Sequence, residues 1–341
     1  MKSVIWMGYG YCGGGALRDV FREFDCHVRF PGEFRLIKER YGLSDLEHAF
    51  FSGFDPDKID IAIKDFRWLC KKYAGRHGRF RKAGLSYNFY TADKFLELIE
   101  NFIDEITAYQ YPMSWHLYDF RKSYPILMRD RFKDLLIGNP QKKYKMANMP
   151  ITSYEAFICA ARNLIDNILN SFLLATDQSQ EATVLLSKAL APSNMAEFEE
   201  GRKYFKKSRV FLIDRDPRDI YMDLLSNGKQ RYLPSNKDGI EKARSFINFF
   251  KAARINQKEL RSSPNVLFVR FEDLVLDYEK TLYKLYEWLD VSPSSHLKKG
   301  KIFDPEISSS NVGQWRKLKG EELLSIKLIE SQLDDFLYEN L

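Results

Sequence analysis

The sequence is poor in the residues that build metal centres and disulfide frameworks. It contains five histidines and only four cysteines, Cys12, Cys26, Cys70 and Cys159, with no CxxC pair and no zinc-ligand spacing. We therefore expect no metal site. Scattered single cysteines are typical of proteins in a reducing compartment, where disulfides do not persist.

Long apolar runs are also missing. No stretch approaches the ~20 residues needed to span a bilayer, and the first apolar segment, residues 3–7 (SVIWM), is too short for a signal peptide. We expect a cytoplasmic protein with no integral membrane segment. The net charge of +6 suits anionic ligands, but the dense basic clusters of nucleic-acid-binding proteins are absent, so no nucleic-acid partner is expected.

A glycine-rich turn follows this first apolar segment. Five glycines occur in the eight residues from Gly8 to Gly15, and residues 16–24 (ALRDVFREF) then show helical spacing. A strand, a glycine turn and a helix start together form an anion cradle, because the first N–H groups of a helix lack partners and glycine allows close approach. A plain tight turn needs one or two glycines, so the sequence favours a phosphate-binding loop.

A second motif lies in the middle of the chain. Residues 210–213 (VFLI) are apolar and predict a buried strand, and the charged turn Asp-Arg-Asp-Pro-Arg-Asp follows at residues 214–219. Pro217 is tolerated in the first turn of a helix beginning there. Arg215 and Arg218 are placed to bind an anion at the end of the strand. The alternative is a solvated loop whose Asp and Arg residues pair with each other.

Strands and long helices alternate along the second half of the chain. Apolar strands are expected at residues 183–186, 210–213 and 266–269, and helices at residues 154–174, 239–260, 278–289 and 321–338. This alternation predicts an α/β fold with a parallel β-sheet flanked by helices.

A middle segment is rich in aromatic rings and cations. We expect one domain over residues 1–341, in which residues 51–150 form a helical insertion (helices at 59–73 and 92–109) between a loop region at 1–50 and the rest of the core at 151–341.

Sugars offer apolar faces for stacking, and acidic sugars attract cations. The alternative is an aromatic helical core with a solvated basic face. The expected substrate-binding residues are Arg35, Arg76, His77, Arg79 and Arg81.

Taken together, these motifs resemble the sulfotransferase family, whose members transfer sulfonate from 3′-phosphoadenosine 5′-phosphosulfate (PAPS) and release adenosine 3′,5′-bisphosphate. In that family an N-terminal glycine loop binds the 5′-phosphosulfate, and an Arg-Asp-Pro-Arg-Asp motif, matched here by residues 215–219, binds the 3′-phosphate. Further family segments are resembled by residues 185–194, 266–274 and 310–317. The resemblance implies the P-loop-like sulfotransferase fold. The lack of an anchor and stem, which the Golgi members have, favours a bacterial protein.

The resemblance also implies a set of cofactor-binding residues. They come from the glycine loop, the arginine motif, the strand end near residue 271 and the segment after residue 310: Gly10, Tyr11, Cys12, Gly13, Gly14, Gly15, Ala16, Arg215, Asp223, Phe271, Asn311, Gly313, Gln314, Trp315 and Arg316.

This sequence departs from the family pattern at several of these positions. Tyr11 stands where a Lys or Arg contacts the transferred sulfonate, so Lys188 or Arg18 is expected to replace that cation. Asp223 stands eight residues after Arg215, where a serine contacts the 3′-phosphate. An ionised Asp repels a phosphate, so Asp223 must face elsewhere, be neutralised, or signal a changed donor.

Sulfonate transfer to a hydroxyl group needs a general base. The resemblance places this base at a Glu or His after the first loop. Glu33 is therefore the first choice, followed by His116 and then His27, and Lys188 completes the expected catalytic set. A lone His beside aromatic rings is more often a hydrogen-bonded core residue.

Three functions remain open. The first is a PAPS-dependent sulfotransferase acting on a hydroxyl of a carbohydrate, whether polysaccharide, oligosaccharide or glycolipid. The second is a Rossmann-type enzyme using NAD or S-adenosylmethionine, because Gly8-x-Gly10-x-x-Gly13 matches the dinucleotide fingerprint, although residues 25–33 are a poor second strand. The third is a non-catalytic descendant that binds a nucleotide or glycan. A homo-oligomer is neither predicted nor excluded.

Overall fold

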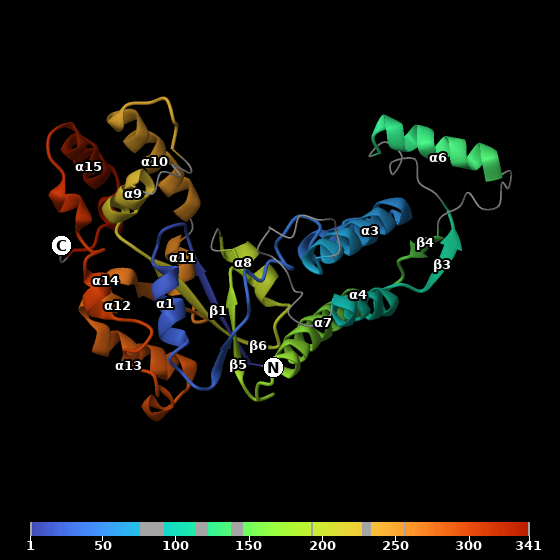
Figure 1. The fold of residues 1–341 in the computed structure, drawn as a ribbon, viewed down its shortest axis with the longest axis horizontal. Helices are drawn as coiled ribbons and strands as arrows, with labels where there is room; N and C mark the ends of the chain where they lie inside the picture. Colours follow the sequence, from blue (N-terminus) through green and yellow to red (C-terminus); the bar gives the residue numbers. More distant parts are fainter. Residues whose placement is uncertain are drawn as a thin grey trace. The chain divides into compact units, whose positions relative to one another are not determined.

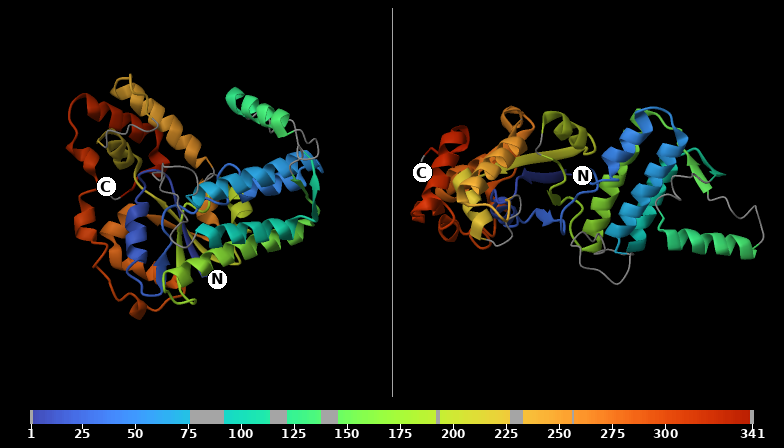
Figure 2. Two further views of the ribbon diagram at one scale, coloured as in Figure 1. Left: turned by 45° about the vertical axis from the view of Figure 1, so that its right-hand side comes forward. Right: turned by 90° about the horizontal axis from the view of Figure 1, so that it is seen from above.

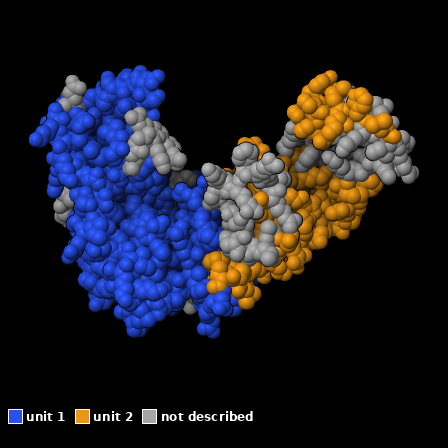
Figure 3. Space-filling view, viewed as in Figure 1, with its two compact units in different colours: residues 1–35, 177–341 blue, residues 36–176 orange. Residues whose placement is uncertain are grey.

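The computed structural model describes residues 2–75, 92–113, 122–137, 146–191, 194–226, 233–255 and 257–339. Contacts divide the chain into two compact units (Figure 3). Unit 1 comprises residues 1–35 and 177–341, and unit 2 comprises residues 36–176. The predicted insertion, residues 51–150, falls within unit 2, and its grouping with the core into a single domain stays a prediction.

Unit 1 is built on a parallel five-stranded sheet. Its strands are β1 (Lys2–Gly8), β2 (His27–Arg29), β5 (Thr183–Ser187), β6 (Lys207–Asp214) and β7 (Val266–Arg270), in the order β2-β5-β1-β6-β7. Every neighbouring pair is parallel. Helices follow the strands along the chain (Figure 1), which confirms the α/β class.

The register of the sheet brings distant segments together at its carboxyl edge. Gly8 of β1 is level with Ile213 of β6, and Trp6 of β1 is level with Ser187 of β5. The residues that follow these three strands therefore emerge side by side. The glycine loop leaves β1 between its two neighbours, at the kind of position where open α/β sheets bind ligands.

The order of the strands argues against the dinucleotide-binding alternative. In the Rossmann fold the strand after the first helix pairs with the first strand. Here β5 stands between β1 and β2, so among the described strands β2 pairs with β5 and not with β1. The glycine fingerprint at residues 8–13 therefore lies in a different topology.

Helices pack against the sheet of unit 1. The helices of unit 1 are α1 (Gly14–Phe21), α8 (Met195–Arg202), α9 (Pro217–Ser226), α10 (Gly239–Arg254), α11 (Gln257–Ser262), α12 (Phe271–Leu276), α13 (Tyr278–Leu289), α14 (Pro305–Ser309) and α15 (Glu321–Gln332), with short 3₁₀ turns η2 (Pro293–Ser295), η3 (Gln314–Lys317) and η4 (Asp334–Phe336). Leu17, Val20 and Phe21 of α1 pack on Val4 and Trp6 of β1 and on α12 and α13, which fixes the start of α1 at the sheet edge. A second cluster joins α9, α10 and α15.

Unit 2 is mainly helical. It contains α2 (Leu43–Phe51), α3 (Pro56–Tyr73), α4 (Ala92–Ile106), α6 (Tyr124–Ile137), α7 (Tyr154–Ala175) and an antiparallel pair, β3 (Tyr109–Pro112) with β4 (Met146–Met149). Helices α3, α4 and α7 run alongside one another (Figure 2). No helix among the described residues of either unit is long and apolar enough to cross a membrane.

Three sequence-based element boundaries were wrong. The helix expected at residues 92–109 ends at Ile106, where the Thr107 hydroxyl donates to the Ile103 carbonyl at 2.8 Å, and Tyr109 already belongs to β3. The helix expected at 239–260 ends at Arg254 and a separate helix follows. The helix expected at 321–338 ends at Gln332. Residues 27–29 do form an edge strand, a short one supported by the β5 backbone.

Candidate functional site

The glycine loop ends in a sharp turn at the start of α1. Tyr11 and Gly13 have left-handed backbones, with φ of 65° and 88°. Ala16 and Leu17 donate their N–H groups to the Gly13 carbonyl at 3.0 and 3.3 Å. The helix therefore begins here, and the N–H groups at Gly14 and Gly15 have no helical carbonyl to bind. Such a helix start attracts an anion.

Only glycine fits at position 13. A Cβ atom there would lie 2.5 Å from Cδ2 of Phe271, the first residue of α12, and the positive φ disfavours any L side chain. The glycine therefore allows the loop from β1 to lie directly against the end of β7.

The Cys12 thiol takes no charge in this loop. Cys12 is buried and its Sγ donates to the Tyr9 carbonyl at 2.7 Å. Burial, with a smaller contribution from Asp214, raises the pKa of Cys12 to about 12. The thiol is therefore protonated at neutral pH and does not repel an anion bound at the loop.

Arg215 reaches from β6 to the glycine loop. Its side chain is 4% exposed, and its Nη1 donates to the Tyr11 carbonyl at 3.3 Å. The same Nη1 lies 2.5 Å from Asp223 Oδ2, and Nη2 donates to the Asn311 carbonyl at 2.5 Å. The guanidinium also lies over the Phe271 ring, 5.1 Å from its centroid. One arginine thus joins its own motif to the other three predicted cofactor-binding segments.

The second arginine of the motif has a structural role. Arg218 binds both carboxylate oxygens of Asp216, at 2.9 and 2.7 Å, and reaches Glu330 of α15 at 2.9 Å. Its guanidinium lies 4.0 Å from the centroid of the Trp315 ring. The pairing alternative therefore holds for Arg218, although the pair is buried rather than solvated.

Asp214 and Asp219 of the motif accept hydrogen bonds from segments that lie far away in the sequence. Asp214 is fully buried and accepts two hydrogen bonds from Arg254, each at 2.8 Å, and one from Gln257 at 2.6 Å. Burial acts to raise the pKa of Asp214, but Arg254 and its other donors outweigh it and lower the pKa. Asp219 accepts the N–H groups of Gly313 and Gln314, both at 2.8 Å.

A pocket of ≈ 400 Å³ opens around the glycine loop, and we call it the loop pocket. The loop residues from Gly8 to Gly15 line it on one side. The charged side chains that line it are Arg18, Arg29, Lys188 and Glu33, three cations and one carboxylate. The loop pocket is therefore electropositive.

Glu33 and Lys188 form an ion pair in the loop pocket. The Lys188 Nζ lies 2.5 Å from Glu33 Oε1, and Arg35 Nη1 lies 3.4 Å from Glu33 Oε2. Burial acts to raise the pKa of Glu33, but Lys188 and then Arg35 outweigh it and lower the pKa. Glu33 is therefore an ionised carboxylate at neutral pH. Lys188 follows β5 with a left-handed backbone (φ 55°), which directs it toward the loop beside it.

Arg29 is a functional candidate that the sequence did not reveal. It ends β2 and lines the loop pocket, and its guanidinium makes no hydrogen bond or ion pair within the described chain. Partial burial lowers the pKa of Arg29, and Arg18 and Arg22 lower it further. An anion bound here would relieve that repulsion. Arg18 itself is paired with Asp19 at 2.9 and 3.0 Å.

A second pocket, of ≈ 420 Å³, lies on the other side of the loop, and we call it the arginine pocket. It shares Tyr11, Gly13 and Gly15 with the loop pocket. Its charged lining residues are Arg215, Asp19, Asp223 and Asp304, one cation and three carboxylates. Phe271, Ala16 and Asn311 also line it.

A buried carboxylate fixes the far wall of the arginine pocket. Glu23, just after α1, accepts the N–H groups of Ile302 and Phe303 at 2.8 and 2.9 Å. His296 Nε2 lies 2.7 Å from the same carboxylate. Glu23 was not predicted, because a charged residue near the end of an amphipathic helix looks solvent-exposed in the sequence.

Several predicted site residues lie away from the two pockets or outside the described chain. Gly313, Gln314, Trp315 and Arg316 line neither pocket; the first two donate to Asp219 and Trp315 packs against Arg218. Arg35 also lines neither pocket. The residues outside the described part of the chain are His116, Arg76, His77, Arg79 and Arg81.

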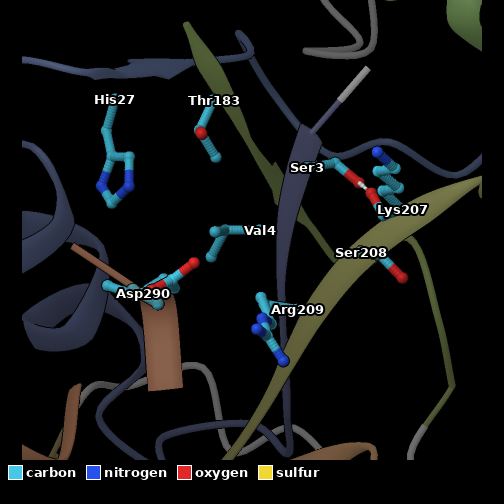
Figure 4. A pocket seen from close by; sticks show the side chains of 9 residues that line it. Ser3, Val4, His27, Thr183, Lys207, Ser208, Arg209 and Asp290 are labelled. Atoms are coloured by element: carbon cyan, nitrogen blue, oxygen red, sulfur yellow. Dashed lines mark hydrogen bonds between the residues drawn. The ribbon is translucent and has the colours of Figure 1, made fainter. Parts of the chain in front are cut away.

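His27 lies at the opposite edge of the sheet. It begins β2, level with Thr183, the first residue of β5, and lines a pocket of ≈ 290 Å³ at the amino ends of the strands (Figure 4). His27 Nδ1 lies 3.3 Å from the Phe21 carbonyl. Burial lowers the pKa of His27 to about 4. This position separates His27 from the glycine loop, so it does not suit the role of a base there.

The described residues form an α/β protein with two adjoining pockets lined by charged side chains at the carboxyl edge of its sheet. In a comparison with protein families, the model of the sulfotransferase family matches residues 113–294, more than half of the chain. The chain belongs to the sulfotransferase family. The match contains the arginine motif and β7, whereas the glycine loop lies before it.

Solved structures similar to this chain include several sulfotransferase domains. The domain from the curacin biosynthetic pathway has 15% identity and a TM-score of 0.45, with 99% of each chain covered. The domain from the Synechococcus PCC 7002 olefin synthase has 13% identity and a TM-score of 0.44, covering 97% of this chain and 94% of that one. STF9 from Mycobacterium avium has 12% identity and a TM-score of 0.39, covering 98% and 76%. No curated protein sequence matches the chain.

Proposed function

We propose that this protein transfers sulfonate from PAPS to a hydroxyl group of a carbohydrate. The observation that carries the proposal is the junction of the two pockets. The loop pocket and the arginine pocket share Gly13, and Arg215 donates to the loop carbonyl of Tyr11. A nucleotide with phosphates at both ends of its ribose needs two neighbouring anion sites of this kind.

The described residues fit the two ends of such a donor. The 5′-phosphosulfate would bind the N–H groups at Gly14 and Gly15, which have no helical carbonyl to bind, with Arg29 and Lys188 as cations. The 3′-phosphate would bind Arg215, whose buried Nε has no hydrogen-bond partner within the described chain. When bound, PAPS supplies the transferable sulfonate group.

Glu33 is the proposed base. Its ionised carboxylate lines the loop pocket and is held there by Lys188 and Arg35. It would accept the proton of the acceptor hydroxyl while Lys188 lies next to the sulfonate oxygens. Because these cations lower the pKa of Glu33, we expect its contribution to come chiefly from its position.

The carbohydrate acceptor rests on the character of residues 51–150. Among the described residues of this segment, Trp68 is 47% exposed and Tyr109 is 56% exposed, and an exposed ring offers a flat face for a sugar. Sulfonate transfer from a labelled donor to a panel of glycans tests this part. The panel should include simple alcohols and sterols. Transfer to these alone would contradict the carbohydrate assignment and leave the donor assignment standing.

The donor assignment is tested by removing Arg215. We expect Arg215→Ala to weaken the binding of adenosine 3′,5′-bisphosphate roughly tenfold, measured by calorimetry. Arg215→Ala leaves the Asp223 carboxylate without its partner, which could by itself destabilise the fold. The double variant Arg215→Ala/Asp223→Asn removes that unpaired charge, and it should bind the bisphosphate as weakly as Arg215→Ala does. Arg209→Ala is the matched control, because Arg209 lies on the same strand at the amino edge. Unchanged affinity in Arg215→Ala, or tighter binding of NAD or S-adenosylhomocysteine, would refute the assignment.

A further inference from the structure

Arg215 is already engaged by a carboxylate of the chain itself. Asp223 lies on α9, eight residues after Arg215, and its Oδ2 is 2.5 Å from Arg215 Nη1. With Nη2 bonded to the Asn311 carbonyl, both terminal nitrogens have partners, and only Nε lacks one within the described chain. The side chain of Asp223 is 22% exposed, so the pair lies at the wall of the arginine pocket.

A phosphate entering this pocket meets an adverse charge. Asp19 and Asp304 line the same pocket as Asp223, and Arg215 is the one cation among the described lining residues. Asp19 is itself paired with Arg18 and Arg22, at 2.9 and 3.3 Å, so part of its charge is compensated. Asp223 is the carboxylate that shares the guanidinium with the incoming group. Like charges on one cation repel, and the carboxylate must rearrange before a phosphate gains the same hydrogen bonds.

A ribose hydroxyl meets the opposite situation. A carboxylate accepts hydrogen bonds and a hydroxyl donates one, so Asp223 would pair with a free 3′-hydroxyl without giving up Arg215. The same side chain that opposes a 3′-phosphate therefore accommodates a nucleotide lacking it.

We propose that Asp223 determines the selectivity of the donor site, by competing with the 3′-phosphate for Arg215. The inference rests on the proposed function, since it takes the arginine pocket as the 3′ end of the nucleotide site. It adds that the wild-type protein binds the bisphosphate more weakly than Arg215 alone would allow. Its preference for the bisphosphate over adenosine 5′-monophosphate is correspondingly small.

The test is calorimetry with adenosine 3′,5′-bisphosphate and adenosine 5′-monophosphate. In Asp223→Asn and Asp223→Ser we expect the bisphosphate to bind roughly tenfold more tightly than in the wild type. The monophosphate should bind with equal or lower affinity. Two variants are used so that a folding defect in one, seen in its thermal unfolding, does not decide the result.

Asp304→Asn is the matched control. Asp304 lines the same pocket but caps α14 through its side chain, as an asparagine also can, and it does not contact Arg215. Its removal should tighten the bisphosphate by no more than about threefold, because only the longer-range charge changes. Unchanged or weaker bisphosphate binding in both Asp223 variants would overturn the inference alone, as would an equal gain in Asp304→Asn. Absence of bisphosphate binding in every protein would overturn the proposed function and the inference with it.

Discussion

The loop pocket and the arginine pocket share Tyr11, Gly13 and Gly15 and have opposite charge. The loop pocket carries three cations and one carboxylate, whereas the arginine pocket carries one cation and three carboxylates. In the loop pocket Arg29 has no ion pair within the described residues. In the arginine pocket the cation is already paired with Asp223.

An anion would therefore meet different surroundings in the two pockets. The loop pocket offers the N–H groups at the start of α1 and the guanidinium of Arg29, which has no ion pair within the described residues, so an anion gains the contact with Arg29 without displacing a carboxylate. The arginine pocket is neutralised internally, so an anion must compete. We therefore expect the loop pocket to supply most of the free energy of nucleotide binding. Substitutions in each pocket should show how much that pocket contributes.

The largest effect is expected from Glu33→Gln in the loop pocket. The amide keeps the shape of the carboxyl group but cannot take a proton, so turnover should fall roughly 10²- to 10⁴-fold. Bisphosphate affinity should not fall, because the change removes a carboxylate that competes with the 5′-phosphate for Lys188. Steady-state sulfonate transfer and calorimetry measure the two quantities. Turnover close to that of the wild type would exclude Glu33 as the base.

Gly13→Ala tests one of the three residues that the two pockets share. The added Cβ would lie 2.5 Å from the Phe271 ring at a positive φ, so we expect a loss of about 3 kcal/mol of unfolding free energy. Urea unfolding measures it. Gly300→Ala is the control, because its φ is also positive (72°) but nothing lies within 4 Å of the added Cβ. It should lose only about 1 kcal/mol. Equal losses would show that the contact with Phe271 is unimportant.

The amino edge of the sheet provides a contrast with both pockets, through the pH dependence of His27. The unfolded chain binds a proton at this residue near pH 6.5, whereas the folded chain binds it only near pH 4. The contribution of neutral His27 to stability is therefore complete above pH 6.5. About 2–3 kcal/mol should be lost as the pH falls from 6.5 to 4.

His27→Asn should reduce that loss, because its amide can still donate to the Phe21 carbonyl but does not titrate. Urea unfolding of both proteins at several pH values isolates the difference. Parallel stability curves for the two proteins would contradict a buried neutral His27.

The smallest effect is expected for Arg29→Ala. Losing one charge-assisted contact should weaken bisphosphate binding roughly tenfold. Arg22→Ala removes a neighbouring arginine that lines neither pocket, and because only its exposed ion pair with Asp19 is lost, the affinity should change by less than about threefold. If Arg29→Ala binds the bisphosphate as tightly as the wild type does, Arg29 does not contribute to anion binding in the loop pocket.

The sequence predicted the sheet well because its central strands are short apolar runs that end in glycine or charged turns. The strands expected at residues 3–7, 183–186, 210–213 and 266–269 all occur, each within three residues of the expected ends. The edge strand at residues 27–29 was not expected, because a three-residue segment with His and Arg has no pattern of its own. Its hydrogen bonds come from β5. Arg29 was missed for the same reason, because it reaches the loop pocket only when this strand forms.

The arginine motif shows a different limit of the sequence. Spacing alone makes Arg215 and Arg218 equivalent, and the fold separates them: one reaches the glycine loop and the other is enclosed by Asp216, Glu330 and Trp315. Those partners lie as far as residue 330, so no local pattern identifies them. The same holds for the contact between Gly13 and Phe271.

The most direct test of the account is a crystal structure of the wild-type protein with adenosine 3′,5′-bisphosphate. The account predicts one nucleotide across both pockets, with its 5′-phosphate at the N–H groups of Gly14 and Gly15 and its 3′-phosphate on Arg215. A nucleotide held elsewhere, or one that contacts the glycine loop while Arg215 stays bound only to Asp223, would contradict it.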